Sequence, residues 1–352
     1  MPSDARTEIG QLLMMGMPGP HLDKETEHLI REDRIGGVVL FSRNIEGPLQ
    51  LAALCRDLQR AALKRQEFPL FLAVDQEGGR VARLKEPFTG FPGNAAVGMN
   101  KEPAKRAVEF ATVTAGEMKL VGLNMNLAPV VDVQRGETEK HLEGRSFGED
   151  PKRVAFLGRT VVKHLQKNGI MAVAKHFPGL GRADVDPHFL LPRINVGLEE
   201  LERVHFPPFA AAVRAGVCGI MTSHALYPAL DPERPATLSP IVLTEVLRGK
   251  MGFKGLTITD DLEMGAIAAN WSVAEGALQS FRAGADILLI CKDQGHVRQS
   301  LERMQRALRE GSITIKRVAE SLRRIKRMKK KYLGYREGIS LAEVKQYFKR
   351  DA

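Results

Sequence analysis

The stretch "GLTITDD" at residues 255–261 is a short apolar run, rich in β-branched residues, that ends in two adjacent aspartates. Runs of this kind indicate buried strands. Seven more occur along the chain, at residues 11–16, 36–41, 70–75, 125–133, 171–177, 219–224 and 285–291. A helix-like stretch follows each run, near residues 22–33, 48–66, 103–121, 151–168, 198–215, 239–251, 273–284 and 295–310. Near-continuous apolar strands bracketed by helices are typical of a parallel sheet that is covered on both faces.

Eight strand–helix units in strict alternation predict an α/β fold, specifically a closed (β/α)8 TIM barrel. The alternative is a doubly wound open sheet, but no Gly-x-Gly-x-x-Gly motif follows the first strand-like run. Polar residues also gather at the C-terminal ends of five runs: Asp75, Asp132, Lys175 with His176, Ser223 with His224, and Asp260 with Asp261. Because the active site of such a barrel lies at this end of the strands, the pattern favours the barrel and locates the site.

The length of 352 residues and the apolar fraction of 43% suit one large barrel with a sizeable core. The net charge of +10 is concentrated at one end. Residues 314–352 contain thirteen Lys or Arg and four Asp or Glu, which amounts to +9. We therefore predict a (β/α)8 barrel that carries the site over residues 1–313, and a basic helical extension over residues 314–352 that packs on the barrel or trails from it.

The extension contains "ESLRRIKRMKKKYLG" (residues 320–334), in which Leu322, Ile325 and Met328 form one apolar stripe. A solvated helix packed on the barrel explains this stripe, and the alternative is a surface for nucleic acid or an anionic membrane. The aromatic interleaving that single-strand binders use is missing, and we expect no nucleic-acid partner. Every motif lies before Lys329, so removal of the chain from Lys329 onward is expected to spare activity.

The N-terminus and the cysteines bear on the compartment. No apolar run reaches membrane-spanning length, and "MPSDARTEIGQLLMMGMPG" has Asp4 and Glu8 before only a short apolar patch, unlike a secretory signal. The three cysteines, Cys55, Cys218 and Cys291, are far apart and odd in number, as in a protein of a reducing compartment. We therefore expect a cytoplasmic protein without a membrane span.

The segment "KHFPGLGRADVDPHFLLP" (residues 175–192) gathers ionisable groups where Gly and Pro prevent any regular element. Asp184, Asp186 and His188 stand at alternate positions, so they are candidate metal ligands on one face of an extended segment. Alternatively, Asp186 and His188 form a proton-transfer pair on a mobile loop. Pro187 between two ligands and the nearby cation of Arg182 weigh against a metal.

Two further segments carry candidates for chemistry. Successive strand residues point to opposite faces, so only one of Asp260 and Asp261 is expected to act as nucleophile or base, and the other to bond backbone. In "AVDQEGGRVARL", Arg80 and Arg83 follow a Gly-Gly turn after Asp75 and can reach back toward the site.

The remaining candidates lie in two other segments. Arg145, in "HLEGRSFGEDP", can clamp hydroxyls or a carboxylate, and "GEDP" signals a helix start. His224 is expected to line the floor of the pocket.

Four motifs occur in order along the chain: "AVDQEGGRV", "GRSFGEDP", "KHFPG" followed by "DPH", and "GLTITDDLEM". Together they resemble glycoside hydrolase family 3, specifically its single-domain bacterial β-N-acetylhexosaminidases. The resemblance covers about residues 8 to 330. It implies that Asp260 is the nucleophile and that Asp186 and His188 form an Asp-x-His dyad with the histidine as general acid/base. It further implies that sugar hydroxyls are bound by five residues: Asp75, Arg83, Arg145, Lys175 and His176.

This sequence departs from the family pattern at two loop positions. The family's loop reads Lys-His-Phe-Pro-Gly-His-Gly, and Leu180 replaces the second histidine; the dyad reads Asp-Ser-His, and Pro187 replaces the serine. Neither change removes a catalytic group. Histidine suits acid/base chemistry because its unperturbed pKa is about 6.5, near cytoplasmic pH.

The resemblance implies a retaining hydrolase that releases terminal β-linked N-acetylglucosamine through a covalent glycosyl-enzyme, as in the recycling of peptidoglycan fragments. The expected partner is a small carbohydrate, and neither a cofactor nor a metal is expected. Alternatives are a glycosyl phosphorylase, because a histidine repels phosphate less than a carboxylate would, and a β-glucosidase or xylosidase on the same barrel. A non-catalytic sugar-binding protein is a further alternative, against which the intact Asp260 and dyad argue.

Overall fold

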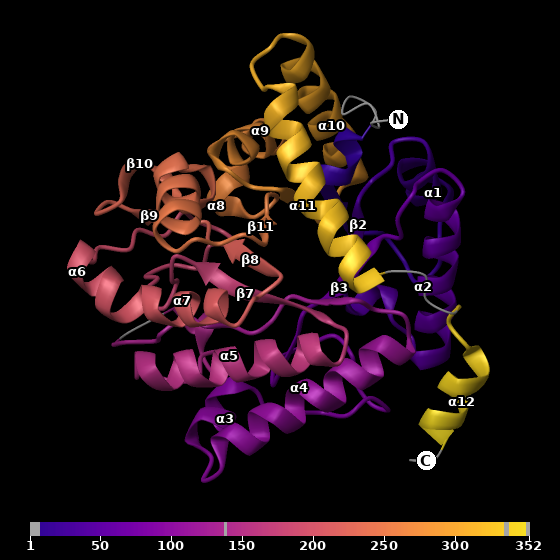
Figure 1. The fold of residues 1–352 in the computed structure, drawn as a ribbon, viewed down its shortest axis with the longest axis horizontal. Helices are drawn as coiled ribbons and strands as arrows, with labels where there is room; N and C mark the ends of the chain where they lie inside the picture. Colours follow the sequence, from indigo (N-terminus) through magenta and orange to yellow (C-terminus); the bar gives the residue numbers. More distant parts are fainter. Residues whose placement is uncertain (1–7, 137–138, 334–337, 350–352) are drawn as a thin grey trace.

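The computed structural model describes residues 8–136, 139–333 and 338–349, and its centre is a closed barrel of parallel strands (Figure 1). The barrel strands are β1 (Leu13–Met15), β2 (Gly37–Val39), β3 (Phe71–Val74), β6 (Met125–Asn126), β7 (Met171–Phe177), β8 (Gly219–Thr222), β11 (Leu256–Asp261) and β12 (Ile287–Ile290). They lie in chain order around the barrel, and β12 pairs with β1 to close it. Each strand coincides with one of the predicted apolar runs, so the prediction of a (β/α)8 barrel is confirmed.

Helices surround the barrel in the predicted alternation. They are α1 (Lys24–Arg31), α2 (Pro48–Leu63), α4 (Pro103–Leu120), α5 (Pro151–Lys167), α6 (Leu198–Glu200), α7 (Phe206–Arg214), α9 (Val273–Ala283) and α10 (Gln294–Arg309), with two π-helices, η4 (Leu201–His205) and η6 (Ile241–Lys250). The start signal "GEDP" is confirmed, because the Asp150 side chain accepts a hydrogen bond from the Lys152 amide and Pro151 occupies the first turn of α5.

The strands are buried on both faces, as their composition predicted. Met14 of β1 pairs with Leu289 of β12 on one side and with Gly37 of β2 on the other. The missing side chain of Gly37 leaves the room that Met14 and Phe71 occupy, since a Cβ there would lie 2.8 Å from Met14 Cγ and 2.9 Å from Phe71 Cβ. The core is therefore continuous from the barrel interior to the surrounding helices.

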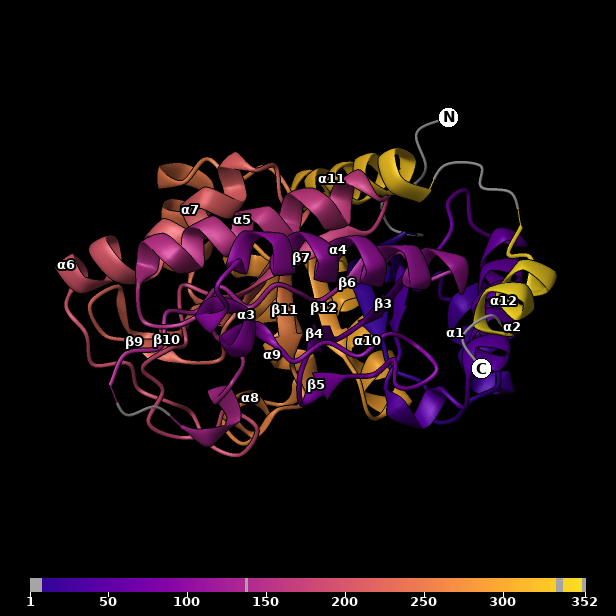
Figure 2. The ribbon, with the colours of Figure 1, turned by 90° about the horizontal axis from the view of Figure 1, so that it is seen from below.

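Short elements gather at the C-terminal ends of the strands. They are the hairpin of β4 (Gln76–Gly78) and β5 (Val81–Ala82), the hairpin of β9 (Leu226–Tyr227) and β10 (Asp231–Pro235), helices α3 (Asn94–Met99) and α8 (Gly265–Ala268), and the 3-10 turns η2 (Ser42–Asn44), η3 (Lys140–Leu142) and η5 (Ala236–Leu238). Figure 2 shows β4, β5 and α8 on one side of the strands and α11 (Ile315–Leu333) on the other. The Gly-Gly turn leads from β4 to β5 of the first hairpin, and both Gly78 and Gly79 have positive φ.

Helix α11 covers the N-terminal end of the barrel, where it contacts the 3-10 turn η1 (Ile9–Leu12). Leu322 and Ile325 of the predicted stripe are buried, and Met328 packs against the core at partial exposure. The buried carboxylate of Asp286 holds the helix through Arg324 (2.9 Å) and the Ser321 hydroxyl (2.6 Å). The division into barrel and extension at residue 314 stays a prediction.

The C-terminal part of α11 corrects one expectation. Lys329 is fully buried, and Tyr332 and Leu333 are also buried, so removal of the chain from Lys329 would expose the core. Beyond it, α12 (Leu341–Lys349) lies against α2 (Figure 1). Among the described residues, no helix is both long and apolar enough to cross a membrane.

Candidate active site

A buried ionic network occupies the C-terminal end of β3 and β7. The Lys175 ammonium lies 2.7 Å from Asp75 Oδ1 and 2.7 Å from Glu77 Oε1. Arg145 donates two hydrogen bonds of 2.9 Å to the two oxygens of Glu77, from Nε and Nη2. The sequence analysis named Asp75, Arg145 and Lys175 as site residues, and the structure brings them together around Glu77, which it had not named.

Electrostatics keep this network charged. Burial would raise the pKa of Glu77, but the charges of Lys175 and Arg145 outweigh it and hold that pKa far below its usual range. Burial would likewise lower the pKa of Lys175, yet Asp75 and Glu77 raise it on balance. Both directions agree, so the lysine remains an ammonium and the glutamate a carboxylate.

The two arginines of the first hairpin have different positions. Arg83 Nη2 lies 3.6 Å from Asp75 Oδ2, so Arg83 joins the network as expected. Arg80 instead donates a hydrogen bond to the carbonyl of Lys140 (2.5 Å) in the loop that follows β6. It therefore braces a neighbouring loop, and the expectation that Arg80 reaches the site is not met.

His176 is held by Asp132, the polar residue at the end of the run at 125–133. His176 Nδ1 is 2.8 Å from Asp132 Oδ2, and the backbone amide of Leu180 donates to Asp132 Oδ1 (2.7 Å). The Leu180 side chain is itself buried. At the position where the family has histidine, this chain therefore places an apolar side chain in the core and uses its backbone to support the loop.

The two adjacent aspartates of β11 differ in their hydrogen-bond partners, and Asp261 bonds backbone, as one of the two was expected to. Asp261 Oδ1 accepts backbone hydrogen bonds from Glu263 (3.1 Å) and Cys291 (3.2 Å). Burial and the neighbouring carboxylates of Glu263 and Asp260 raise the pKa of Asp261 to about 7. Asp260, by contrast, bonds only the amide of Asp261 among the described hydrogen bonds.

Three cationic or ionisable side chains surround Asp260. Burial would raise its pKa, but the charges of His176, His224 and Lys175 lower it on balance, so Asp260 is ionised at neutral pH. His224 Nε2 donates to the carbonyl of Asp261 (3.0 Å), and burial lowers the pKa of this histidine. A carboxylate at the barrel mouth with no strong side-chain partner is chemically available.

The pair of Asp186 and His188 is formed. Asp186 Oδ1 accepts a hydrogen bond from His188 Nδ1 (2.7 Å) and another from the His188 backbone amide (2.9 Å). An ionised aspartate only accepts, so Nδ1 carries a proton and Nε2 is the nitrogen that can exchange one. The His188 side chain is 57% exposed, as a group that meets substrate must be.

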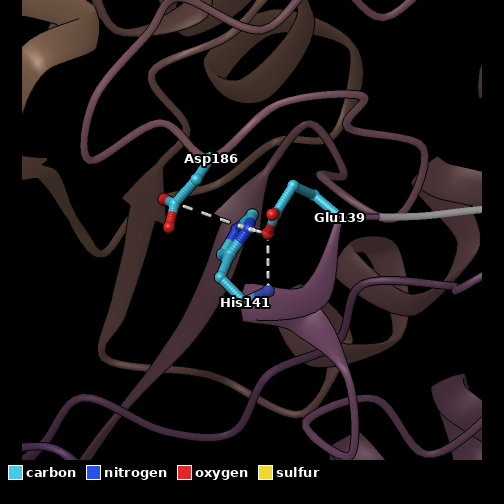
Figure 3. Close-up of side chains that lie close together, drawn as sticks. All are labelled: Glu139, His141 and Asp186. Atoms are coloured by element: carbon cyan, nitrogen blue, oxygen red, sulfur yellow. Dashed lines mark hydrogen bonds and ion pairs between the residues drawn. The ribbon is translucent and has the colours of Figure 1, made fainter.

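A second histidine lies against the same aspartate. His141 Nδ1 is 2.8 Å from Glu139 Oε2 and 4.0 Å from Asp186 Oδ1, and Figure 3 shows its ring between the two carboxylates. The Glu139 oxygen also accepts the backbone amide of His141 (2.6 Å). Burial lowers the pKa of His141. Glu139 and His141 were not predicted from the sequence.

This cluster bears on the metal hypothesis. Ligand atoms of Glu139, His141 and Asp186 lie within 4.8 Å of one another, whereas Asp184 and His188 are not part of that set. The hydrogen bond between His141 Nδ1 and Glu139 holds two members of this set together. Among the residues that the structure describes, Asp184, Asp186 and His188 are not brought together as one set of ligand atoms.

A cavity of about 580 Å³ on the flank of the barrel contains none of these residues. It lies between α1 and α2 and is lined by His21, Gln50 and Arg60, among others. The candidate catalytic residues therefore lie outside this cavity.

This chain is similar to known proteins in both sequence and fold. Residues 5–328 match the N-terminal domain of glycosyl hydrolase family 3. Beta-hexosaminidase A of Pseudoalteromonas piscicida is 34% identical over 332 residues, which are 88% of this chain but 56% of that protein, so the chain spans little more than half of it. The beta-hexosaminidase of Alkalilimnicola ehrlichii is 39% identical over 284 residues, 79% of this chain and 80% of the relative.

A solved structure extends this likeness to the whole fold. The glycoside hydrolase family 3 beta-N-acetylglucosaminidase of Paenibacillus sp. superposes with a TM-score of 0.91 at 34% identity, covering 100% of this chain and 68% of that one. The barrel, with Asp260 and the hydrogen-bonded pair of Asp186 and His188 after its strands, fits this likeness. The chain belongs to glycosyl hydrolase family 3, and it is a glycosidase.

Proposed function

We propose that the protein is a retaining β-N-acetylglucosaminidase, with Asp260 as nucleophile and His188 as general acid/base. The observation that carries the proposal is the contrast between the two neighbouring aspartates. Asp261 is bonded to two backbone amides, whereas Asp260 keeps a lowered pKa beside His176 and Lys175 and has no hydrogen bond to a side chain among the described residues. An ionised carboxylate without a fixed partner suits attack on an anomeric carbon.

The reaction proceeds in two steps. In the first, Asp260 attacks the anomeric carbon while His188 donates the proton on Nε2 to the leaving oxygen, and a glycosyl-enzyme forms. In the second, neutral Nε2 takes a proton from water, and the water releases the sugar. Asp186 fixes the ring through Nδ1 in both steps and stabilises the imidazolium when it is present.

The terminal sugar is bound by the charged groups around the nucleophile. Asp75, Arg83, Arg145, Lys175 and His176 present donors and acceptors for its hydroxyls. Hydrogen bonds hold four of these groups, Lys175 to Asp75, Arg145 to Glu77 and His176 to Asp132, so little of their side-chain freedom is lost when substrate binds. The relatives named for hexosaminidase or N-acetylglucosaminidase activity support N-acetylglucosamine as the sugar. Recycling of peptidoglycan fragments in the cytoplasm is the proposed setting.

The test compares a 4-nitrophenyl β-N-acetylglucosaminide with the matching glucoside. Preference for the acetamido sugar supports the proposal, and preference for the glucoside contradicts it. Turnover should be lost in Asp260→Ala, and a labelled 2-fluoro sugar should remain on wild-type Asp260. In Asp261→Asn we expect a larger loss of stability than of turnover. Equal loss of turnover at both positions in folded protein would reject Asp260 as the nucleophile.

The phosphorylase alternative is separated from hydrolysis by the products. With inorganic phosphate added, a phosphorylase forms a sugar 1-phosphate, whereas a hydrolase releases the free sugar at an unchanged rate. Phosphate-dependent turnover would replace water by phosphate in the second step and leave the first step as described.

A further inference from the structure

The loop that carries His188 is bonded to the segment directly after the strand that carries Asp260. The backbone amide of Gly265 donates to the carbonyl oxygen of His188 (2.9 Å), and the amide of Ala266 donates to the carbonyl oxygen of Pro187 (3.1 Å). Both amides belong to the first turn of α8, and α8 begins a few residues after the end of β11. Two backbone hydrogen bonds thus join the loop that carries His188 to α8, the helix that follows the strand of Asp260.

The contact is close because residue 265 is glycine. A Cβ on Gly265 would lie 2.4 Å from the carbonyl oxygen of Phe189, 2.7 Å from its carbonyl carbon and 2.8 Å from its Cα. All three are backbone atoms, so no flexible side chain can move aside. Gly265 is not among the glycines with positive φ, and alanine is the better helix former. The approach of the loop is therefore what requires glycine here.

Hydrogen bonds to Asp186 hold the turn at residues 186–190 together. Besides the two hydrogen bonds from His188 to the Asp186 side chain, the amides of Phe189 and Leu190 donate to the Asp186 carbonyl at 3.0 and 3.1 Å. A displacement at Phe189 is thus transmitted to His188, its neighbour in the chain.

The side chains of this turn are unevenly buried, because Pro187 is buried and the residues after it are exposed. Phe189 is 73% exposed and Leu190 is 61% exposed. On the far side, His141 approaches Asp186 only to 4.0 Å. The position of the turn therefore depends on the buried Pro187 and on the backbone contacts with α8.

We propose that Gly265 is a positioning residue for the acid/base: its missing side chain lets the turn at 186–190 dock on α8 and holds His188 beside the strand of Asp260. This inference rests on the proposed function of His188. It also explains how the loop tolerates Pro187, because the docked turn uses the carbonyl of residue 187 and needs no amide hydrogen from it.

The test is Gly265→Ala, with Gly116→Ala as the matched control. Gly116 lies in α4, and a Cβ there would meet nothing within 4 Å. Rates are measured on N,N′-diacetylchitobiose, whose leaving sugar needs a proton, and on the 2,4-dinitrophenyl β-N-acetylglucosaminide, whose leaving group does not. Because a shift of about 1 Å can slow a reaction by about 10²-fold, we expect Gly265→Ala to slow the disaccharide by about 10- to 100-fold.

The rates at which the glycosyl-enzyme forms and breaks down distinguish a misplaced His188 from a general loss of active-site structure. Formation of the glycosyl-enzyme from the dinitrophenyl substrate should stay near the wild-type rate in Gly265→Ala, its breakdown should be slow, and azide should speed that breakdown. Gly116→Ala should match wild type throughout. Wild-type rates for Gly265→Ala on the disaccharide, or equal losses on both substrates, would overturn the positioning role.

His188→Ala, measured in parallel, keeps the two proposals apart. If His188→Ala loses activity equally on good and poor leaving groups, the acid/base assignment fails. If His188→Ala shows the leaving-group dependence and Gly265→Ala does not, only the role of Gly265 fails. Should Gly265→Ala not fold, amide hydrogen exchange in wild type decides: slow exchange at Gly265 and Ala266 supports the docking, and exchange at the rate of free amides overturns it.

Discussion

Replacement of Glu77 by glutamine tests the ionic network that supports the sugar-binding groups. The carboxylate is 1% exposed and receives three contacts of 2.7 to 2.9 Å from Lys175 and Arg145. Glutamine has nearly the same shape, but it removes the negative charge and turns an amide donor toward cationic donors. Asp75 alone would then face the positive charges of Lys175, Arg145 and Arg83.

The expected loss of stability follows from the burial of these charges. Removal of one partner from a buried ion pair costs about 3–5 kcal/mol. For 352 residues, an unfolding entropy of about 2.1 cal/mol/K per residue amounts to roughly 0.7 kcal/mol/K, so Tm should fall by roughly 4–7 °C. The KM for an aryl N-acetylglucosaminide should rise as well, because Arg145 and Lys175 lose the acceptor that orients them.

Thermal melts and steady-state kinetics at pH 6–8 provide the assay, with Glu310→Gln on the exposed end of α10 as the control. The control should shift stability by no more than about 0.5 kcal/mol. Since the folded pKa of Glu77 lies below its ordinary value of 4.5, its contribution is fully present above pH 4.5 and is lost as pH falls further. The difference between wild type and Glu77→Gln should therefore shrink only below that pH. A Glu77→Gln protein that melts within 1 °C of wild type with unchanged KM would refute the reasoning.

Three other changes give distinct outcomes. His188→Ala should slow a natural β-linked disaccharide by about 10²–10⁴-fold and let a covalent intermediate accumulate on Asp260 from a dinitrophenyl glycoside; uniform loss without azide rescue would contradict the acid/base role. Burial lowers the pKa of Lys329 from 10.5 to about 7, so the folded chain binds fewer protons than the unfolded chain between these pH values, and stability from Lys329 rises with pH across that window. Relative to Lys329→Met, urea melts of wild type should gain up to about 3 kcal/mol from pH 7 to pH 9, at about 1.4 kcal/mol per pH unit, and a flat difference would show that Lys329 stays protonated in the folded chain across this range. Asp286→Asn should lower the free energy of unfolding by about 3–5 kcal/mol in the same melts, because Arg324 and its neighbours lose a buried counter-charge, and a change below 1 kcal/mol would contradict that account.

The amino-acid sequence by itself determined the barrel. Short apolar runs such as "GLTITDD" identify buried strands wherever they stand in the chain, since a strand covered on both faces must be apolar along its length. The polar residues at the ends of five of these runs follow from the same principle, because the strand leaves the core there. For this reason Asp75, Lys175, His176 and Asp260 could be assigned to one end of the barrel without any knowledge of their partners.

Only the tertiary structure decided which side chains meet. Glu77 contacts Lys175 and Arg145 across 98 and 68 residues of sequence, and nothing in "VDQEGG" distinguishes Glu77 from a solvated turn residue. The His141 contact with Asp186 and the approach of Gly265 to Phe189 likewise join loops that follow different strands. Local preferences act over a few residues, whereas these contacts exist only once the barrel closes and its βα loops converge over one mouth.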